Sequence, residues 1–329
     1  MPNSHKADVT GRGELVTGEA QLGERLSTYL RAAAGSLSAN TVRAHRADLG
    51  RFAAWCAERG LCALPAGAAT VAAYVEAMEG TRAPATLRRY VSTIAAAHRA
   101  AEERSPSEHA EVQRALRRIR RRKGSRQTQV EGLTWKLRQR LVEAAGGERV
   151  IDVRNRAILA VAYDAMLRRS ELVALEVVDV TMDSGGSASL LVRRAKTDPE
   201  GRGTMLYLHR DTVRLLGEWL AAADASAGPL FRSVRKDGAV GGRLDASQVP
   251  RIYRAMAERA GLPGWTVRRI SGHSPRVGAA QDMIAAGVGI AAIMQAGRWK
   301  SPAMVQRYGE RLLAKRNGAA QLARLQKRR

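Results

Sequence analysis

Aromatic side chains are scarce in this chain of 329 residues, of which only 4% are Phe, Trp or Tyr. Hydrophobic residues still make up 45% of the sequence, so a core must be built mainly from Ala, Leu, Val, Ile and Met. Alanine and leucine favour helices. The composition therefore predicts mainly α-helical, globular folding, and the length allows two domains with separate cores.

Cysteines and long apolar runs are also lacking. Cys56 and Cys62 are the only cysteines, too few for a structural zinc site without several histidines nearby. A disulfide between them stays open but is not indicated, and a reducing compartment fits. No run of about 18 apolar residues predicts a membrane span, and MPNSHKADVTGRGELVTGE lacks the apolar core of a signal peptide. We expect residues 1–20 to be a disordered arm and the protein to be cytoplasmic.

Acidic residues are too few to balance the basic ones. Lys and Arg number 55 against 31 Asp and Glu, which gives a net charge of +24 spread over the whole chain. A protein that neutralises phosphates releases their counterions, so nucleic acid is the leading partner. A merely basic soluble protein is the alternative.

Residues 21–122 have the pattern of a helical bundle. Apolar residues recur at three-to-four spacing, Ser38 is a suitable cap for one helix, and Pro84 suits the first turn of another. His45 and His98 both fall on apolar stripes. We therefore interpret them as core histidines and not as metal ligands.

A basic run, RRIRRRK at residues 117–123, breaks this helical pattern and is followed by the polar stretch GSRQTQVEG. One interpretation is a solvated charge run. The other is a linker that crosses a phosphate backbone and holds two domains on opposite faces of a duplex, which better explains seven basic residues between positions 117 and 126. We predict a linker over residues 123–132 and a second domain over 133–329.

The second domain combines helices with a small β-hairpin. Two alternating runs at residues 188–193 and 204–209 predict the hairpin, and the loop between them carries Lys196. The glycine-rich stretch KDGAVGGR is expected to be an exposed loop. Helices are predicted at residues 134–145, 155–167, 211–222, 247–260, 275–286, 290–296 and 302–308, with a final apolar-faced segment at about 318–326.

Residues 271–308 concentrate groups suited to phosphate chemistry. His273 and Arg276 are followed by Trp299 and Tyr308. Ser274 and Pro275 resemble an N-cap and a first-turn proline, which would put Arg276 in the opening turn of a helix, where the dipole and free N–H groups favour anions. A structural histidine, a surface arginine, a packing tryptophan and an interface tyrosine are the plainer interpretations.

Acidic residues show no convincing metal cluster, although Asp179 and Asp183 are close in sequence. Many nucleases cut DNA with two metals held by carboxylates. The metal-free solution combines arginines with a protein nucleophile, because a guanidinium contacts two phosphate oxygens at once and stays charged. We therefore expect no metal and no cofactor.

These motifs resemble the tyrosine recombinase (phage integrase) family over roughly residues 25–326. SGHSPRVGAAQDM, IMQAG, Trp299 and Tyr308 resemble its catalytic end. YDAMLRRSEL resembles the first-arginine motif, with Arg168 and its acidic companion Glu171, and RRAKT resembles the hairpin motif, with Lys196. The resemblance implies a mainly α fold with a small β-hairpin or sheet. It also implies two domains, a core-binding bundle and a catalytic domain, that close as a C-shaped clamp.

The resemblance also implies a role for each matched residue. Tyr308 attacks the scissile phosphate, making a 3′-phosphotyrosyl link and freeing a 5′-hydroxyl. Arg168 and Arg276 bind the non-bridging oxygens and Trp299 adds an indole donor. Lys196 protonates the 5′-oxygen, His273 assists proton transfer, and Glu171 holds the geometry. Without the resemblance, Lys196 is a phosphate contact or a solvated lysine, Arg169 competes with Arg168, and Glu171 is a helix-end acid.

The implied partner is double-stranded DNA with inverted repeats, exchanged through a Holliday junction by four protomers, with neither membrane nor small-molecule substrate. We expect a prokaryotic, plasmid or phage protein associated with the nucleoid, whose last helix docks into a neighbouring protomer. A type IB topoisomerase-like nicking and closing enzyme and a catalytically silent DNA-binding module are the alternatives. The expected DNA contacts are Arg43, Arg46, Arg88, Arg89, Arg118, Arg121, Arg122, Lys123, Arg232, Arg235 and Lys236.

Overall fold

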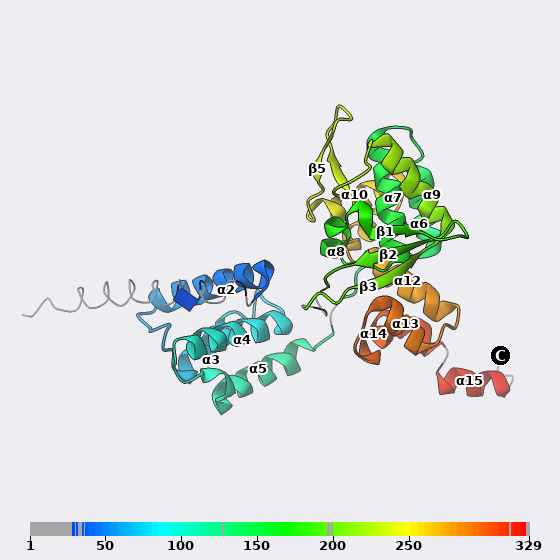
Figure 1. The fold of residues 1–329 in the computed structure, drawn as a ribbon. Coiled ribbons are helices and arrows are strands. Elements are labelled where there is room, and N and C mark those ends of the chain that lie inside the picture. Colours follow the sequence, from blue (N-terminus) through cyan, green and yellow to red (C-terminus); the bar gives the residue numbers. More distant parts are fainter. Residues whose placement is uncertain are drawn as a thin grey trace, which may run out of the picture. The chain divides into compact units, whose positions relative to one another are not determined.

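The chain divides into two compact units, Met1–Gln127 and Thr128–Arg329. A computed structural model describes residues 28, 29, 31, 35, 37–126, 128–195, 198, 200–315 and 317–326 (Figure 1). The arm expected at residues 1–20 lies outside the described residues. The boundary between the units falls within the segment predicted to be a linker.

The first unit is a helical bundle. Its helices are α2 (Ala39–Ala57), α3 (Ala68–Ala77), α4 (Pro84–Ala100), a short 3₁₀ turn η1 (Pro106–Glu108) and α5 (Ala110–Lys123). Ser38 caps α2, since its side chain accepts from the N–H of Thr41, and Pro84 occupies the first turn of α4. Apolar faces of all four helices meet in one core that includes Phe52, Tyr74 and Leu87. The predicted bundle is confirmed.

The basic run does not end the helical pattern, contrary to the sequence interpretation. α5 continues to Lys123, with Ile119 buried and the arginines of its last two turns exposed. Arginine and lysine are good helix formers, and cations favour a helix C-terminus, so the charge supports the helix. Only the residues after Lys123 connect the two units.

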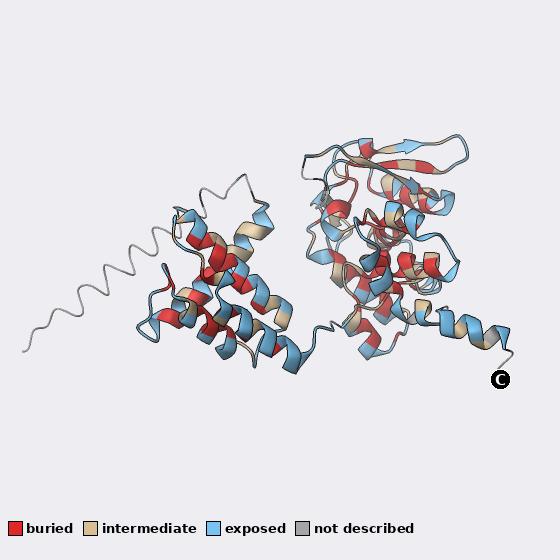
Figure 2. Cartoon of the chain, turned by 90° about the horizontal axis from the view of Figure 1, so that it is seen from below, coloured by how far each residue is buried: buried red, intermediate tan, exposed pale blue. Residues whose placement is uncertain are grey.

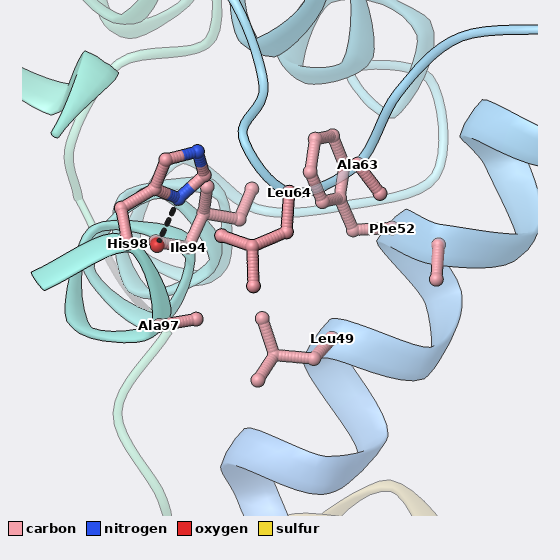
Figure 3. Close-up of a pocket in the computed structure, with 8 residues that line it drawn as sticks. Leu49, Phe52, Ala63, Leu64, Ile94, Ala97 and His98 are labelled. Atoms are coloured by element: carbon pink, nitrogen blue, oxygen red, sulfur yellow. Dashed lines mark hydrogen bonds between the residues drawn. The ribbon is translucent and has the colours of Figure 1, made fainter. Parts of the chain in front are cut away.

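His98 is a core histidine, as predicted. Its ring accepts from the N–H of Ala66 at 2.8 Å and bonds the Ile94 carbonyl at 2.8 Å, so both nitrogens are satisfied inside the bundle. Figure 3 shows it beside a small apolar cavity between α2 and α4, which Leu49 and Phe52 also line. His45 is only partly buried and bonds the hydroxyl of Tyr29 at 2.7 Å.

The second unit is also mainly helical. Its largest core is formed by α6 (Trp135–Ala144), α7 (Val150–Asp164), α9 (Arg210–Ala222), α10 (Gln248–Arg259) and the inner face of a small sheet. Figure 2 shows buried residues concentrated in the middle of this unit. The remaining helices are α8 (Arg169–Ala174), η2 (Val177–Asp179), α11 (Gly264–Arg269), α12 (Ser274–Ala285), α13 (Ile290–Gly297), α14 (Pro302–Ala314) and α15 (Gly318–Leu325).

The predicted hairpin is confirmed and carries a third strand. β2 (Ala188–Val192) pairs antiparallel with β3 (Thr204–Leu208), and β1 (Val180–Met182) pairs with the other edge of β2. Alternate residues of β2 are buried, so one face of the sheet covers the core. The glycine-rich stretch is a second hairpin, β4 (Arg232–Val234) with β5 (Val240–Arg243), and not the loop expected from sequence.

A smaller core joins α12, α13 and α14. Its buried members include Ile293, Val305 and Met166, which lies two residues beyond the end of α7. Trp299 and Tyr308 pack against this core from its edge. It therefore supports the residues that the sequence singled out for phosphate chemistry.

Two smaller expectations can also be compared with the structure. Both cysteines are free, with Cys56 buried and Cys62 exposed. In the part of the chain that the structure describes, no helix is both long and apolar enough to cross a membrane.

Candidate active site

Arg276 lies in the first turn of α12, and its side chain is fully buried. Nη1 donates to the carbonyl of Met166 and Nη2 to the carbonyl of Gly297. Burial lowers the pKa of Arg276 to about 9, with Arg168 and Arg298 adding to the effect, so the guanidinium still carries its charge at neutral pH. Two carbonyls thus fix a buried cation in one orientation.

The start of α12 differs by one residue from the prediction. His273 is the N-cap and Ser274 is the first helical residue, so Ser274 is not the cap. The hydroxyl of Ser274 instead accepts from the N–H of Ser271 at 2.9 Å. Arg276 is then the third residue of α12 and still lies in its first turn, as predicted.

Trp299 packs between Arg276 and Tyr308. The guanidinium carbon of Arg276 lies 4.7 Å from the Trp299 ring centroid, and the Trp299 and Tyr308 centroids are 5.4 Å apart. A cation over an indole face is favourable, and more so when it is desolvated. Trp299 is 9% exposed, so most of the indole is packed and a small part remains accessible in the site.

Tyr308 is half-buried in the middle of α14. Burial raises the pKa of its phenol, while Arg276, Arg307 and Arg168 act in the opposite direction. Two glutamines hold the helix backbone here: Gln129 donates to the carbonyl of Arg307, and Gln281 donates to that of Tyr308 at 3.4 Å. The ring is therefore placed beside several cations on a well-anchored helix.

His273 faces Tyr308, with 6.3 Å between the ring centroids. Burial, together with the charges of Arg276 and Arg168, lowers the pKa of His273 to about 4. The imidazole is consequently neutral at physiological pH. A neutral imidazole can accept a proton, which a protonated one cannot.

Arg168 and Glu171 form an ion pair at the start of α8. Arg168 Nη1 donates to Glu171 Oε1 at 2.6 Å, and the main-chain N–H of Arg168 donates to Oε2 at 3.0 Å. Glu171 is buried, whereas Arg168 keeps 18% of its side chain exposed. The spacing that favoured Arg168 over Arg169 agrees with this arrangement, because Arg169 is exposed.

A third arginine, Arg298, was missed by sequence reasoning. Its Nη2 donates to Glu171 Oε2 at 2.6 Å, and the two residues are 127 positions apart in sequence. Only its place next to Trp299 could have drawn attention to it. Of the seven predicted catalytic residues, the structure brings six together with this arginine, and Lys196 lies outside the described residues.

The expected DNA contacts fall into two groups. Several are used inside their own unit: Arg89 pairs with buried Asp48 at 2.7 Å, and Arg118 with Glu76. Others in this group are Arg43 with Asn40, Arg122 with Glu79, Lys123 with the carbonyls of Glu79 and Arg82, Arg232 with the carbonyl of Ala227, and Arg235 with Asp237. Arg46, Arg88, Arg121 and Lys236 are exposed.

Metal ligands do not gather in this site. Among the residues that the structure describes, no group of three or more His, Cys, Asp or Glu is arranged to hold an ion. Asp179 is buried and pairs with Arg193, and Asp183 accepts from Ser187 and Ser189. These two acids therefore have separate hydrogen-bond partners.

Two family descriptions together match most of the chain. Residues 131–313 match the Phage integrase family, and residues 24–130 match its N-terminal SAM-like domain. The recombinase Cre of Escherichia phage P1 is 30% identical over 275 residues, which cover 78% of this chain and 80% of Cre. An integrase/recombinase XerD homolog of Selenomonas ruminantium is 28% identical over 281 residues, 82% of this chain and 81% of the homolog.

Solved structures share the fold. The lambda integrase tetramer bound to a Holliday junction aligns with a TM-score of 0.60 and 16% identity, covering 87% of this chain and 76% of that one. At this identity the likeness concerns the fold alone.

Proposed function

We propose that this chain, which belongs to the phage integrase family, is a site-specific recombinase that exchanges DNA strands between two short inverted-repeat sites. Members of this family are DNA breaking and rejoining enzymes. The observation that carries the proposal is the grouping of Tyr308 with Trp299, Arg276 and a neutral His273. A phenol, a proton acceptor and a fixed cation are the parts needed to attack a phosphodiester.

The first step is attack by Tyr308 Oη on the scissile phosphorus. A new P–O bond forms to the tyrosine, the bond to the 5′-oxygen breaks, and the DNA 3′-end remains linked to the protein. His273, which is unprotonated at neutral pH, accepts the phenolic proton as the new bond forms. Lys196 donates a proton to the departing 5′-oxygen. Rejoining reverses these transfers with a 5′-hydroxyl from the partner strand, so the bond energy is kept and neither ATP nor metal is consumed.

Charge stabilisation falls to the arginines. Arg168 and Arg276 bind the non-bridging oxygens, whose negative charge increases as the phosphorane forms. Arg276 is supported in this role by its two carbonyl partners, which fix its plane before DNA arrives. Trp299 closes one side of the site and adds its indole N–H as a donor.

Strand exchange requires four protomers on two duplexes. The lambda integrase tetramer on a Holliday junction supports this assembly by its shared fold. We propose that the two units of each protomer bind opposite faces of one duplex. The last helix, α15, would dock into a neighbouring protomer, since Leu322 and Leu325 are 49% and 82% exposed.

The test uses the full chain and a library of duplexes with randomised inverted-repeat arms. After incubation with EDTA and denaturation, DNA that stays covalently attached to protein is recovered and sequenced. A duplex of the recovered sequence, nicked in its spacer to trap the intermediate, serves as the substrate thereafter. We expect wild-type protein to give a 3′-phosphotyrosyl adduct and Tyr308→Phe to give none while still binding DNA.

Three results would contradict the proposal. An adduct formed by Tyr308→Phe would show that another residue is the nucleophile. If wild-type protein gave no adduct, it would not cleave DNA by the proposed reaction. Relaxation of supercoiled plasmid without exchange between two recovered sites would indicate a nicking and closing enzyme of the topoisomerase IB type.

A further inference from the structure

Arg298 has a backbone conformation that favours glycine. It follows the last residue of α13 with φ 50° and ψ 48°, in the left-handed region, where its N–H donates to the carbonyls of Gln295 and Met294. A side chain with a Cβ is disfavoured there, and arginine gains nothing from the turn itself. The reason for arginine at this position must therefore lie in what its guanidinium contacts.

Those contacts are buried and specific. The Arg298 side chain is only 7% exposed, and it donates to the carbonyls of Ala165 and Met166, both at 3.3 Å, besides Glu171 Oε2. The Met166 carbonyl also accepts from Arg276. Arg298 thus shares the Met166 carbonyl with Arg276 and the Glu171 carboxylate with Arg168, the two arginines proposed to bind the phosphate.

Glu171 is the centre of this arrangement. Its Oε1 accepts from Arg168 and its Oε2 accepts from Arg298, each at 2.6 Å. A lone Arg168–Glu171 pair would be neutral, and its guanidinium would have little net charge to offer a phosphate. With Arg298 balancing the carboxylate, Arg168 remains a cation in excess. The cluster of three arginines and one glutamate then matches the double negative charge of a phosphorane.

We propose that Arg298 is a positioning residue for strand cleavage: it neutralises Glu171, so that Arg168 keeps its charge for the phosphate. This inference rests on the proposed recombinase function. Arg298 acts through Glu171 and does not itself contact the DNA. A purely structural role, capping the carbonyls at the end of α7, is the competing explanation.

The two explanations separate in a double-mutant cycle with Glu171→Gln. We measure single-turnover adduct formation on the nicked duplex for wild type, Arg298→Gly, Glu171→Gln and the double variant. Glycine suits the left-handed backbone, so Arg298→Gly removes the guanidinium without adding strain. We expect Arg298→Gly to cleave roughly 100-fold more slowly with DNA affinity changed less than about threefold, the size of effect seen when one transition-state donor is lost.

In the Glu171→Gln background no carboxylate needs balancing. Adding Arg298→Gly there should cost less than about fivefold, since the coupling passes through that charge. An equal loss in both backgrounds would overturn the inference and leave the carbonyl contacts as the cause. No loss in either background would overturn it as well.

Further variants guard against misfolding and backbone effects. If Arg298→Gly does not fold, Arg298→Gln, which removes the charge but keeps a polar side chain, replaces it in both backgrounds of the cycle. Arg298→Lys keeps the charge and should cleave within about tenfold of wild type. Asp224→Gly is the matched control, since Asp224 is an exposed residue with φ 46° away from the site. An adduct from wild-type protein establishes the chemistry independently of every Arg298 result.

Discussion

The guanidinium of Arg276 stacks on the indole of Trp299, with its carbon 4.7 Å from the ring centroid. The ring of Tyr308 also packs against that indole, with 5.4 Å between the ring centroids. One tryptophan therefore sets the distance between the proposed phosphate-binding cation and the proposed nucleophile. Any change that moves the indole is expected to disturb both.

Gly297→Ala tests that dependence. A Cβ at Gly297 would overlap the Trp299 ring, so the indole must shift or the end of α13 must move. We expect unfolding to become easier by about 1–3 kcal/mol and adduct formation to slow by at least tenfold. Thermal unfolding and single-turnover cleavage measure the two effects.

Gly217→Ala is the matched control, because Gly217 lies inside α9 and a Cβ there meets no atom within 4 Å. Alanine should stabilise that helix by about 0.5–1 kcal/mol without changing cleavage. If both variants behave alike, the indole does not set the geometry.

The pH dependence of cleavage should reflect the lowered pKa of His273, which is about 4 instead of its ordinary 6.5. A base with a lowered pKa stays unprotonated, and able to accept a proton, at every pH above that value. We expect single-turnover rates to be flat from pH 8 to about 5.5 and to fall only at lower pH. A tenfold fall between pH 7.5 and 5.5 would show an ordinary histidine in the rate-limiting step. His273→Gln should be slower by roughly 10²–10⁴-fold throughout.

Lys196 can be tested by changing the leaving group. Loss of a general acid costs roughly 10²–10⁴-fold, so Lys196→Ala should cleave the ordinary duplex that much more slowly. A substrate with sulfur in place of the 5′-bridging oxygen releases a thiolate, which needs no proton to depart. Lys196→Ala should then approach the wild-type rate on it, whereas Tyr308→Phe stays inactive. A defect of equal size on both substrates would assign Lys196 to phosphate binding instead.

Two arginines of the first unit are expected to differ in DNA binding. Arg88 is exposed on α4, while Arg122 pairs with Glu79 through both Nε and Nη2 and holds the pKa of that carboxyl below its usual range. If Arg88 contacts one phosphate, Arg88→Ala should reduce the slope of log affinity against log salt by about 0.9. Arg122→Ala should leave the slope nearly unchanged. An equal reduction of the slope in the two variants would mean that the Arg122 ion pair opens on DNA, and an unchanged slope in Arg88→Ala would mean that Arg88 contacts no phosphate.

Much of this molecule was predictable because its signals are local. α2, α4 and the β2–β3 hairpin have caps, a first-turn proline and alternating apolar residues, all of which are visible within a few positions. Strand β1 and the β4–β5 hairpin were missed because they are short and glycine-rich or lack clear alternation. The end of α5 was misjudged because the basic run was taken to break the helix, although arginine and lysine favour one. The ion pairs of its arginines with Glu76 and Glu79, about 40 positions earlier in the chain, add support that only the fold shows.

The site divides in the same way. His273, Arg276, Trp299 and Tyr308 lie within one segment, and the family resemblance supplied Arg168, Glu171 and Lys196. Arg298 had no such signal, since its contribution arises only where the end of α13 meets Glu171. Nor could the sequence show that Arg276 is fully buried and bound to two carbonyls.

The carbonyl of Met166 receives hydrogen bonds from both Arg276 and Arg298. A main-chain oxygen is present whatever amino acid occupies the position, so no substitution at residue 166 can delete this acceptor. A substitution of Met166 can alter packing, but it leaves the carbonyl that accepts hydrogen bonds from both guanidinium groups. Arg276 and Arg298 act through their side chains, so a substitution at either position removes the hydrogen bonds that its guanidinium donates. Random mutagenesis of this chain should therefore recover active variants at position 166 far more often than at 276 or 298.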